Sequence, residues 1–180
     1  YAAHVIVAEA RRHGVEIRNV DLEVSDVGAT VEAEAAGDHS QDHKPAGPKG
    51  AIRLGLDMVR GMGAEAGAAL VAARQQHPFR SLEDLCRRTS LGRRALEALI
   101  LAGGLDRWQR PRRQLLWELE AALRAAKAAP ALGLRPTQEP SFTALPRHKR
   151  LQFEQAYTGA TAGTHITTLV ARQLREMGAT

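Results

Sequence analysis

The sequence predicts a mainly α-helical fold with one small β-hairpin in its first third. Hydrophobic residues make up 44% of the 180 residues but aromatic residues only 4%, so the core has to be built from leucine, valine and alanine, which favours helices over a β-sandwich. From residue 57 onward, apolar residues recur at helical spacing. Two earlier stretches, 29–35 and 51–56, instead alternate apolar and polar residues, which is the period of a half-buried strand.

The amino-terminal region is expected to begin with a helix over residues 2–13 that Gly14 ends, followed by an extended segment over 15–25. The two alternating stretches flank the loop sequence GDHSQDHKPAGPKG, and together they predict a β-hairpin with a long tip. His39 and His43 in this loop have the spacing of metal ligands. A solvated loop is the simpler interpretation, and we expect no metal site there.

The helices after residue 57 are predicted from their start and stop residues. Ser81 with Asp84 three residues later resembles a capping box, and Ser90 is expected to cap the next helix. Pro111 stands at a first-turn position of a long amphipathic helix that Pro130 stops. The expected helices are 57–60, 64–75, 81–88, 92–102, 112–129, 147–157 and 166–177.

Positive charge is concentrated in the middle and the end of the chain. Residues 1–50 carry 5 basic and 9 acidic groups, residues 51–120 carry 12 and 8, and residues 121–180 carry 8 and 3. Eight arginines fall between Arg87 and Arg113, with only Glu97 and Asp106 to oppose them in that stretch. Such density indicates a polyanionic partner, although a solvated helix face also explains many runs of this kind.

Composition also limits where the protein works. Nothing approaches 18 consecutive apolar residues, so we expect no membrane span and no membrane partner. The single Cys86 excludes an internal disulfide and fits a reducing, cytoplasmic location. Because the chain starts at Tyr1 within an apparent helix, we expect it to be a piece of a longer protein.

The sequence Val59-Arg60-Gly61-Met62-Gly63 joins two helical stretches and contains two glycines one residue apart. Gly61 is able to take a positive φ and end the first helix. Gly63 lacks a side chain and so lets a phosphate approach the backbone, while Met62 is expected to pack inward. The N–H groups near Gly61, Gly63 and Ala64 then point outward at a helix start, where they form an anion site.

About thirty residues later, the sequence TSLGRR (89–94) joins two further helical stretches. It keeps one glycine and has arginines in place of neutral residues, so it is a degenerate copy of the first turn. Two such units related by a pseudo-dyad predict a compact four-helix domain. Its two turns would hold the two strands of a duplex by their phosphates, which positions a protein without reading sequence.

Both turns resemble the helix-hairpin-helix motif, and the order of segments resembles bacterial C-family DNA polymerases of the polymerase III alpha subunit type. The resemblance runs through most of residues 1–120 and is carried by YAAHVIVAEARRHGVEIRNVDLEVSD, AIRLGLDMVRGMG, PFRSLEDLCRRTSLGRRALEALILAGGLD and RRQLLWELEAAL. PRHKRLQFEQAYTGATAGTHI (146–166) resembles the segment that leads toward the family's C-terminal OB-fold.

This resemblance implies template-directed DNA synthesis by a whole polymerase, with Mg²⁺ held by palm carboxylates. No Asp-x-Asp occurs in these 180 residues, so we expect them to have no catalytic residues, no cofactor and no metal of their own. Their implied task is to hold the primer–template duplex as it leaves the active site. The implied DNA-binding residues are Arg60, Gly61, Met62, Gly63, Ala64, Ser90, Leu91, Gly92, Arg93 and Arg94.

Some features depart from the family pattern. Asn19 and the following LEV (22–24) stand where relatives carry proline- and asparagine-containing sequence, and the stretch 164–166 departs from the usual Gly-x-His-Pro. Replicative members carry a clamp-binding peptide, and Gln114-Leu115-Leu116-Trp117 is its nearest counterpart here. We expect Trp117 to pack in the core, which favours the error-prone branch, with a sliding clamp or accessory translesion proteins as candidate partners.

Two rival functions remain open from the sequence. A helix-hairpin-helix DNA glycosylase needs a catalytic aspartate about twenty residues after the first turn, where Glu83 and Asp84 stand. Helix capping explains Asp84 more simply. A module whose turns meet protein instead of nucleic acid is the other alternative, and the salt dependence of binding separates it from a DNA-binding domain.

The predicted architecture is thus a tandem helix-hairpin-helix domain of four to five helices with a small β-hairpin and flanking helices. Its expected divisions are a helical end of the fingers, a β-hairpin with a long loop, the DNA-binding domain, a proline-rich linker and a C-terminal helical segment. In that order they cover residues 1–27, 28–56, 57–130, 131–146 and 147–180.

Overall fold

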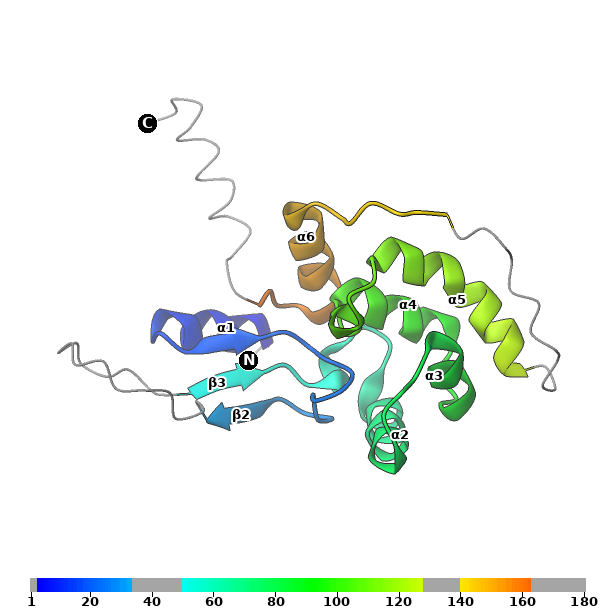
Figure 1. Cartoon of the computed structure of the whole chain (residues 1–180). Coiled ribbons are helices and arrows are strands. Elements are labelled where there is room, and N and C mark those ends of the chain that lie inside the picture. The colour runs from blue at the N-terminus through cyan, green and yellow to red at the C-terminus, as the bar shows by residue number, and fades with distance from the viewer. Residues whose placement is uncertain (1–2, 34–49, 128–139, 163–180) are drawn as a thin grey trace, which may run out of the picture.

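The computed structural model describes residues 3–33, 50–127 and 140–162 (Figure 1). The elements follow the order α1 (Ala3–Arg12), β1 (Glu16–Arg18), β2 (Thr30–Ala33), β3 (Gly50–Arg53), the 3₁₀ turn η1 (Leu56–Met58), α2 (Gly63–Gln76), α3 (Leu82–Arg88), α4 (Arg93–Ala102), the 3₁₀ turn η2 (Asp106–Trp108), α5 (Arg112–Lys127) and α6 (Arg147–Thr158). The described part of the chain is mainly α-helical, as predicted.

The three strands form one small sheet in the order β1-β3-β2. β2 and β3 pair antiparallel with Val31 opposite Ile52, which confirms the predicted hairpin. β1 pairs parallel with β3, and Ile17 lies opposite the same Ile52. The segment predicted only as extended therefore contributes a third strand. Its three residues are too few to show an alternating pattern, so periodicity alone misses it.

Helix α1 and the sheet share a small hydrophobic cluster. Val7 of α1 and Ile17 of β1 are buried in it together with Leu54 and Ala160, the last from the segment after α6. Gly14, with a φ of 76°, ends α1 as predicted. Figure 1 shows α1 and the sheet on one side of the molecule and α2 to α5 on the other.

The main core lies among η1 and helices α2 to α5. Its fully buried side chains are mostly leucines, such as Leu56, Leu85, Leu99 and Leu115, which the low aromatic content predicts. α3 packs along α5, and α4 packs between α5 and α6. Burying a leucine side chain is worth about 1.5–3 kcal/mol, so this layer of leucines is the main force that holds the helices together.

A buried arginine ties the last helices to α4. Arg112, at the first position of α5, is 4% exposed. Its Nε and Nη2 donate to the carboxylate of Asp106 at 2.8 and 2.6 Å, its Nη1 donates to the carbonyl of Leu101 at 2.8 Å, and its Nη2 also donates to Glu154 of α6 at 2.9 Å. This side chain therefore fixes the end of α4, η2 and α6 against the start of α5.

Predicted helix boundaries are mostly confirmed, with two corrections. Ser81 caps α3 by accepting a hydrogen bond from the N–H of Asp84 at 3.1 Å, as predicted. The helix expected over 57–60 is instead the 3₁₀ turn η1, because the chain must turn again within three residues. Ser90 does not cap α4; Gly92 occupies the N-cap position, and no side chain bonds there.

Trp117 is a third correction. It was expected in the core, but it is 47% exposed on the outer side of α5, where its ring lies 6.1 Å from the ring of Phe142. The neighbouring Leu115 takes the core position. Several predictions fall outside the described residues, namely the loop with His39 and His43, the helix stop at Pro130 and the last predicted helix, 166–177.

Candidate nucleic-acid interface

The first glycine turn runs from Val59 to the start of α2. Val59 and Met62 are buried, at 1% and 3% exposure, and they anchor the turn in the main core. Gly61 and Gly63 are exposed between and after these anchors. The sequence prediction that Met62 packs inward is confirmed, so its side chain supports the turn from within while the glycines face solvent.

Both glycines of this turn have a left-handed backbone. The φ angle is 78° at Gly61 and 61° at Gly63, a region that other residues adopt at a cost of about 1–2 kcal/mol. A Cβ atom added at either position would meet nothing within 4 Å. The backbone conformation therefore explains both glycines, and the space beside each of them is open.

Helix α2 starts without a side-chain cap. Its N-cap residue is Met62, whose side chain is buried and makes no capping hydrogen bond. The first four N–H groups of a helix have no partner within the helix, and the helix dipole adds positive charge at this end. The exposed start at Gly63 and Ala64 thus presents bare amides to solvent, which is the chemistry of an anion site.

The turn is braced from behind by α6. The N–H of Arg60 donates a hydrogen bond of 2.7 Å to the carbonyl of Tyr157, in the last turn of α6. The side chain of Arg60 is exposed and makes no ion pair or hydrogen bond with the described residues. The backbone of Arg60 is therefore held in place while its cationic group stays available at the edge of the turn.

The second turn repeats the first one 29 residues later. Leu91, at 9% exposure, takes the place of Met62, and the residues on either side of it, Ser90 and Gly92, are exposed. Gly92 has an ordinary φ of −70°, and a Cβ atom there would also meet nothing within 4 Å. Neither backbone strain nor packing within the described residues accounts for this glycine.

The basic cluster predicted from the sequence is largely neutralised in the structure. Six of its eight arginines form ion pairs with carboxylates. Several partners come from distant segments: Arg107 pairs with Asp21 at 2.9 Å, and Arg93 pairs with Glu120 of α5 at 2.9 Å as well as with Glu97 at 2.7 Å. The expectation of only two opposing acids was wrong, because it counted sequence neighbours alone.

Arg88 belongs to the fold rather than to a binding surface. Its guanidinium donates to the carbonyls of Ala73 and His77 at the end of α2, pairs with Asp84 at 3.2 Å, and lies 4.6 Å from the centre of the Phe79 ring. It thereby joins the first helix pair to the second. Within the arginine cluster, only Arg94 and Arg113 are exposed and make no ion pair with the described residues.

A family model described as the helix-hairpin-helix motif matches residues 14–115, which is more than half of the chain. The chain belongs to the helix-hairpin-helix family. Its two turns, centred on Met62 and Leu91, both lie within the matched range.

Curated relatives of this helix-hairpin-helix chain are error-prone DNA polymerases. The one from Alkalilimnicola ehrlichii is 35% identical over 97% of this chain and 16% of its own length. The one from Symbiobacterium thermophilum is 33% identical over 99% of this chain and 19% of its length, and the one from Burkholderia mallei is 40% identical over 77% and 12%. The chain spans less than a fifth of the length of each of these relatives.

Glu83 and Asp84, the candidate carboxylates of a glycosylase, are engaged in the helix-hairpin-helix scaffold. Glu83 pairs with Arg87. Asp84 accepts hydrogen bonds from the N–H of Arg80 at 3.0 Å and from Arg88 at 3.2 Å. Burial acts to raise the pKa of Asp84, but these bonds outweigh it, and the pKa lies below its ordinary value. Asp84 is thus a capping residue, as the capping pattern predicts.

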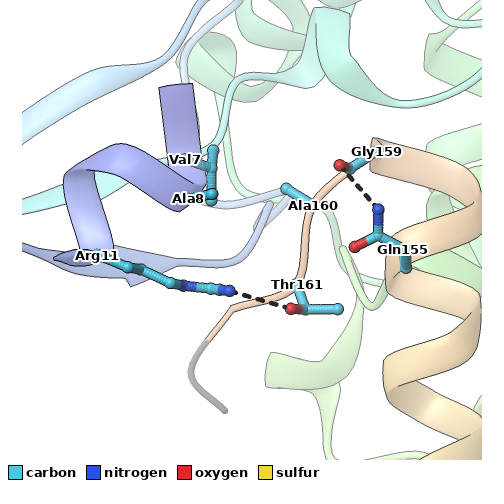
Figure 2. Close-up of a pocket in the computed structure, with 7 residues that line it drawn as sticks. All are labelled: Val7, Ala8, Arg11, Gln155, Gly159, Ala160 and Thr161. Atoms are coloured by element: carbon cyan, nitrogen blue, oxygen red, sulfur yellow. Dashed lines mark hydrogen bonds between the residues drawn. The ribbon is translucent and has the colours of Figure 1, made fainter. Parts of the chain in front are cut away.

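A pocket of about 300 Å³ lies between α1 and the end of α6 (Figure 2). Arg11 reaches across it and donates to the hydroxyl of Thr161 at 3.3 Å, and its Nη2 is buried without a partner in the described residues. Figure 2 shows Val7 and Ala8 of α1 on one side and Gln155 on the other. The residues that line this pocket lie outside both helix-hairpin-helix turns. The hydrogen bond from Arg11 to Thr161 joins α1 to the segment after α6.

The described part of the chain holds no helix long and apolar enough to cross a membrane. It also holds no group of three or more histidine, cysteine, aspartate or glutamate side chains arranged to bind a metal ion. The histidines of the long loop, His39 and His43, lie outside that part.

Proposed function

We propose that this helix-hairpin-helix domain binds duplex DNA through its backbone phosphates, as part of a DNA-directed DNA polymerase of the error-prone type. The proposed contacts are the amides and arginines of the two turns, at Arg60 to Ala64 and at Ser90 to Arg94. The similarity to error-prone DNA polymerases over nearly the whole chain supports the choice of DNA as the partner.

The observation that carries this proposal is Gly92. It is exposed, its backbone has an ordinary φ, and a Cβ atom would be unobstructed, so a larger residue would fit the described structure equally well. A glycine at such a place is explained by a ligand that comes close to the backbone. A phosphate at the amides of α4 is such a ligand, and the open space beside Gly61 and Gly63 leaves room for a second one, although the backbone of these two glycines already accounts for them.

The exposed charges support the same reading. Arg60 beside the first turn and Arg94 beside the second make no ion pair with the described residues, so both are available for phosphate oxygens. Contacts of this kind hold a duplex without regard to its sequence. A polymerase needs this property, because it must hold every sequence that it has copied.

Fluorescence anisotropy with a labelled blunt duplex, measured over a range of salt concentrations, tests the proposal. Neutralising about 4–6 phosphates predicts a slope of roughly −4 to −5 in a plot of log affinity against log salt concentration. Gly63→Val is expected to weaken binding by roughly 1–3 kcal/mol, since it removes close approach and amide contacts. An affinity that is independent of salt would overturn the proposal and favour a protein-interaction module.

The glycosylase alternative has less support, because Asp84 is held in a cap and lacks the free, raised-pKa carboxyl of a general base. A base-excision assay on lesion-bearing duplex with the 180-residue chain would still separate the two functions. Release of the damaged base that is lost in Asp84→Asn would favour the glycosylase.

For the whole polymerase, we propose a cytoplasmic enzyme whose Mg²⁺ ions are held by palm carboxylates, with no metal in the helix-hairpin-helix domain. A sliding clamp or accessory translesion proteins are candidate partners. Trp117, exposed on α5 beside Phe142, offers such a partner an aromatic contact.

A further inference from the structure

Helix α6 begins with four consecutive basic or titratable residues, Arg147 to Arg150, all of them exposed. A helix start carries positive dipole charge, so cations there are unfavourable for the helix itself. Of these four, His148, Lys149 and Arg150 make no ion pair with the described residues. Lys149 and Arg150 therefore place positive charge on the first turn of α6 that the described fold does not neutralise.

The rest of the exposed surface of α6 carries no acid. The helix contains a single carboxylate, Glu154, and that residue is 7% exposed and paired with Arg112 at 2.9 Å. Its other exposed side chains after the first turn are neutral, such as Gln152 and Gln155. The surface of α6 is therefore cationic at its first turn and neutral beyond it, which suits an anionic partner and disfavours a cationic one.

Two aromatic rings lie beside this charge. Phe153 and Tyr157 are half-buried, and their ring centres are 6.4 Å apart. Lys149, Phe153 and Tyr157 follow at intervals of four residues, so they lie on one face of the helix at steps of about 6 Å along its axis. Tyr157 also packs against the main core, whereas Phe153 stands between it and the basic turn.

This face leads to the first hairpin. The carbonyl of Tyr157 accepts the N–H of Arg60, so the aromatic end of α6 is joined directly to the glycine turn. Figure 1 shows α6 beside α4, with its first turn at the outer edge of the helical body and its last turn toward the centre. The end of α6 that carries Tyr157 thus lies next to the first glycine turn, and the basic turn lies at the other end of the helix.

We propose that the face of α6 made by Lys149, Arg150, Phe153 and Tyr157 binds a single strand of DNA. Cations that follow a backbone and aromatic rings on which bases stack are the two components of single-strand binding surfaces. A duplex does not use the rings, because its bases are already stacked on one another, whereas a single strand offers free base faces. This site is separate from the duplex contacts of the two turns.

The test compares a short labelled oligothymidine with a blunt duplex by fluorescence anisotropy, using the 180-residue chain. Phe153→Leu is expected to weaken oligothymidine binding roughly tenfold and to leave duplex affinity unchanged, whereas Phe153→Tyr, which keeps a ring, binds both as the parent chain does. Lys149→Gln with Arg150→Gln lowers the salt slope for oligothymidine by about 0.7 per charge removed. Arg124→Gln with Lys127→Gln, two exposed residues of α5, is the charge-matched control.

Unchanged oligothymidine affinity in Phe153→Leu would overturn the inference. If Phe153→Leu has the same unfolding temperature as the parent chain, an equal loss of affinity for oligothymidine and for duplex would also overturn it. The Lys149→Gln, Arg150→Gln chain alters only exposed side chains, so it decides the matter if Phe153→Leu is unstable. Suppose that Lys149→Gln with Arg150→Gln weakens the binding of heparin while Phe153→Leu leaves oligothymidine affinity unchanged. That result would also overturn the inference, because the face would then bind any polyanion by charge alone. A chain that binds oligothymidine but not duplex supports this inference and contradicts the duplex proposal.

Discussion

The guanidinium of Arg112 and the carboxylate of Glu154 form an ion pair of 2.9 Å in which both side chains are buried, at 3% and 9% side-chain exposure. The two residues are 42 positions apart, and the pair joins α5 to α6. Because α6 braces the first glycine turn through Tyr157 and Arg60, this buried pair belongs to the support of the proposed duplex site.

Removal of Arg112 is therefore expected to destabilise the fold. Arg112→Ala leaves Asp106 and Glu154 without their partner, and breaking a buried pair in this way costs about 3–5 kcal/mol. Arg113→Ala, at the adjacent exposed position, is the matched control, with an expected change within about 0.5 kcal/mol. Urea denaturation followed by circular dichroism measures both, and equal stability of the two variants would contradict this account.

The neighbouring arginines Arg93 and Arg94 are expected to differ in DNA binding. Arg94 is unpaired in the described structure, whereas Arg93 is held by Glu97 and Glu120. Arg94→Ala should flatten the salt slope of duplex binding by about one unit, and Arg93→Ala should change it less. Glu120→Gln is expected to raise duplex affinity slightly, since it removes one of the two carboxylates that hold Arg93. A larger effect of Arg93→Ala than of Arg94→Ala would show that the pairs seen here are exchanged on binding.

Serine at the two glycine positions separates folding from binding. Gly63→Ser places a side chain at a φ of 61° and should cost about 1–2 kcal/mol of stability. Gly92→Ser should leave stability unchanged or slightly higher, because its φ is −70° and serine is a preferred N-cap residue. Duplex affinity should nevertheless fall in Gly92→Ser, since its side chain occupies the phosphate position. Thermal unfolding and duplex titration of the same samples measure both effects, and unimpaired binding by stable Gly92→Ser would refute the role given to Gly92.

Stability should fall in acid through the ion pairs of the sheet. Hydrogen bonds from Arg53 and Arg18 hold the pKa of Glu32 below its ordinary value of 4.5, against the opposing effect of burial. Its contribution to stability is complete above pH 4.5 and is lost as the pH falls through the lower pKa of the folded state. Glu32→Gln lacks this contribution, so its stability should fall less than that of the parent from about pH 5 to about pH 3. Glu65→Gln, which changes an exposed residue of α2, is the control. Urea denaturation at each pH measures the free energy of unfolding of the parent, Glu32→Gln and Glu65→Gln. The same dependence on pH in all three would exclude a contribution from Glu32.

Cys86 is expected to be unreactive in the folded protein. Burial in the main core raises the pKa of its thiol to about 11, and the side chain is 8% exposed. The thiolate is the reactive form, so labelling by a disulfide reagent near pH 8 should be slow in buffer and fast in urea. The chain has one cysteine, so one equivalent of reagent is the end point. Rapid labelling of the folded chain would show that α3 opens on the time scale of the reaction.

The sequence by itself determined the local features of this protein. The glycine turn at Gly61 and Gly63 and the cap at Ser81 depend on residues close together in the chain, and both are confirmed. The pairing of β2 with β3 is also confirmed, because two alternating stretches joined by one loop favour a hairpin. The burial of Met62 follows from the same local pattern. Backbone preferences and periodicity act over a few residues, so a sequence is sufficient to predict them.

Only the tertiary structure decided which charges remain available. In the sequence, Arg107 and Arg112 belong to a basic cluster. In the structure, Arg107 pairs with Asp21, 86 positions away, and Arg112 pairs with Glu154, 42 positions away. The parallel pairing of β1 with β3 and the exposure of Trp117 are of the same kind. Charge neutralisation and burial depend on distance in space, and distances between remote segments are fixed only when the whole chain has folded.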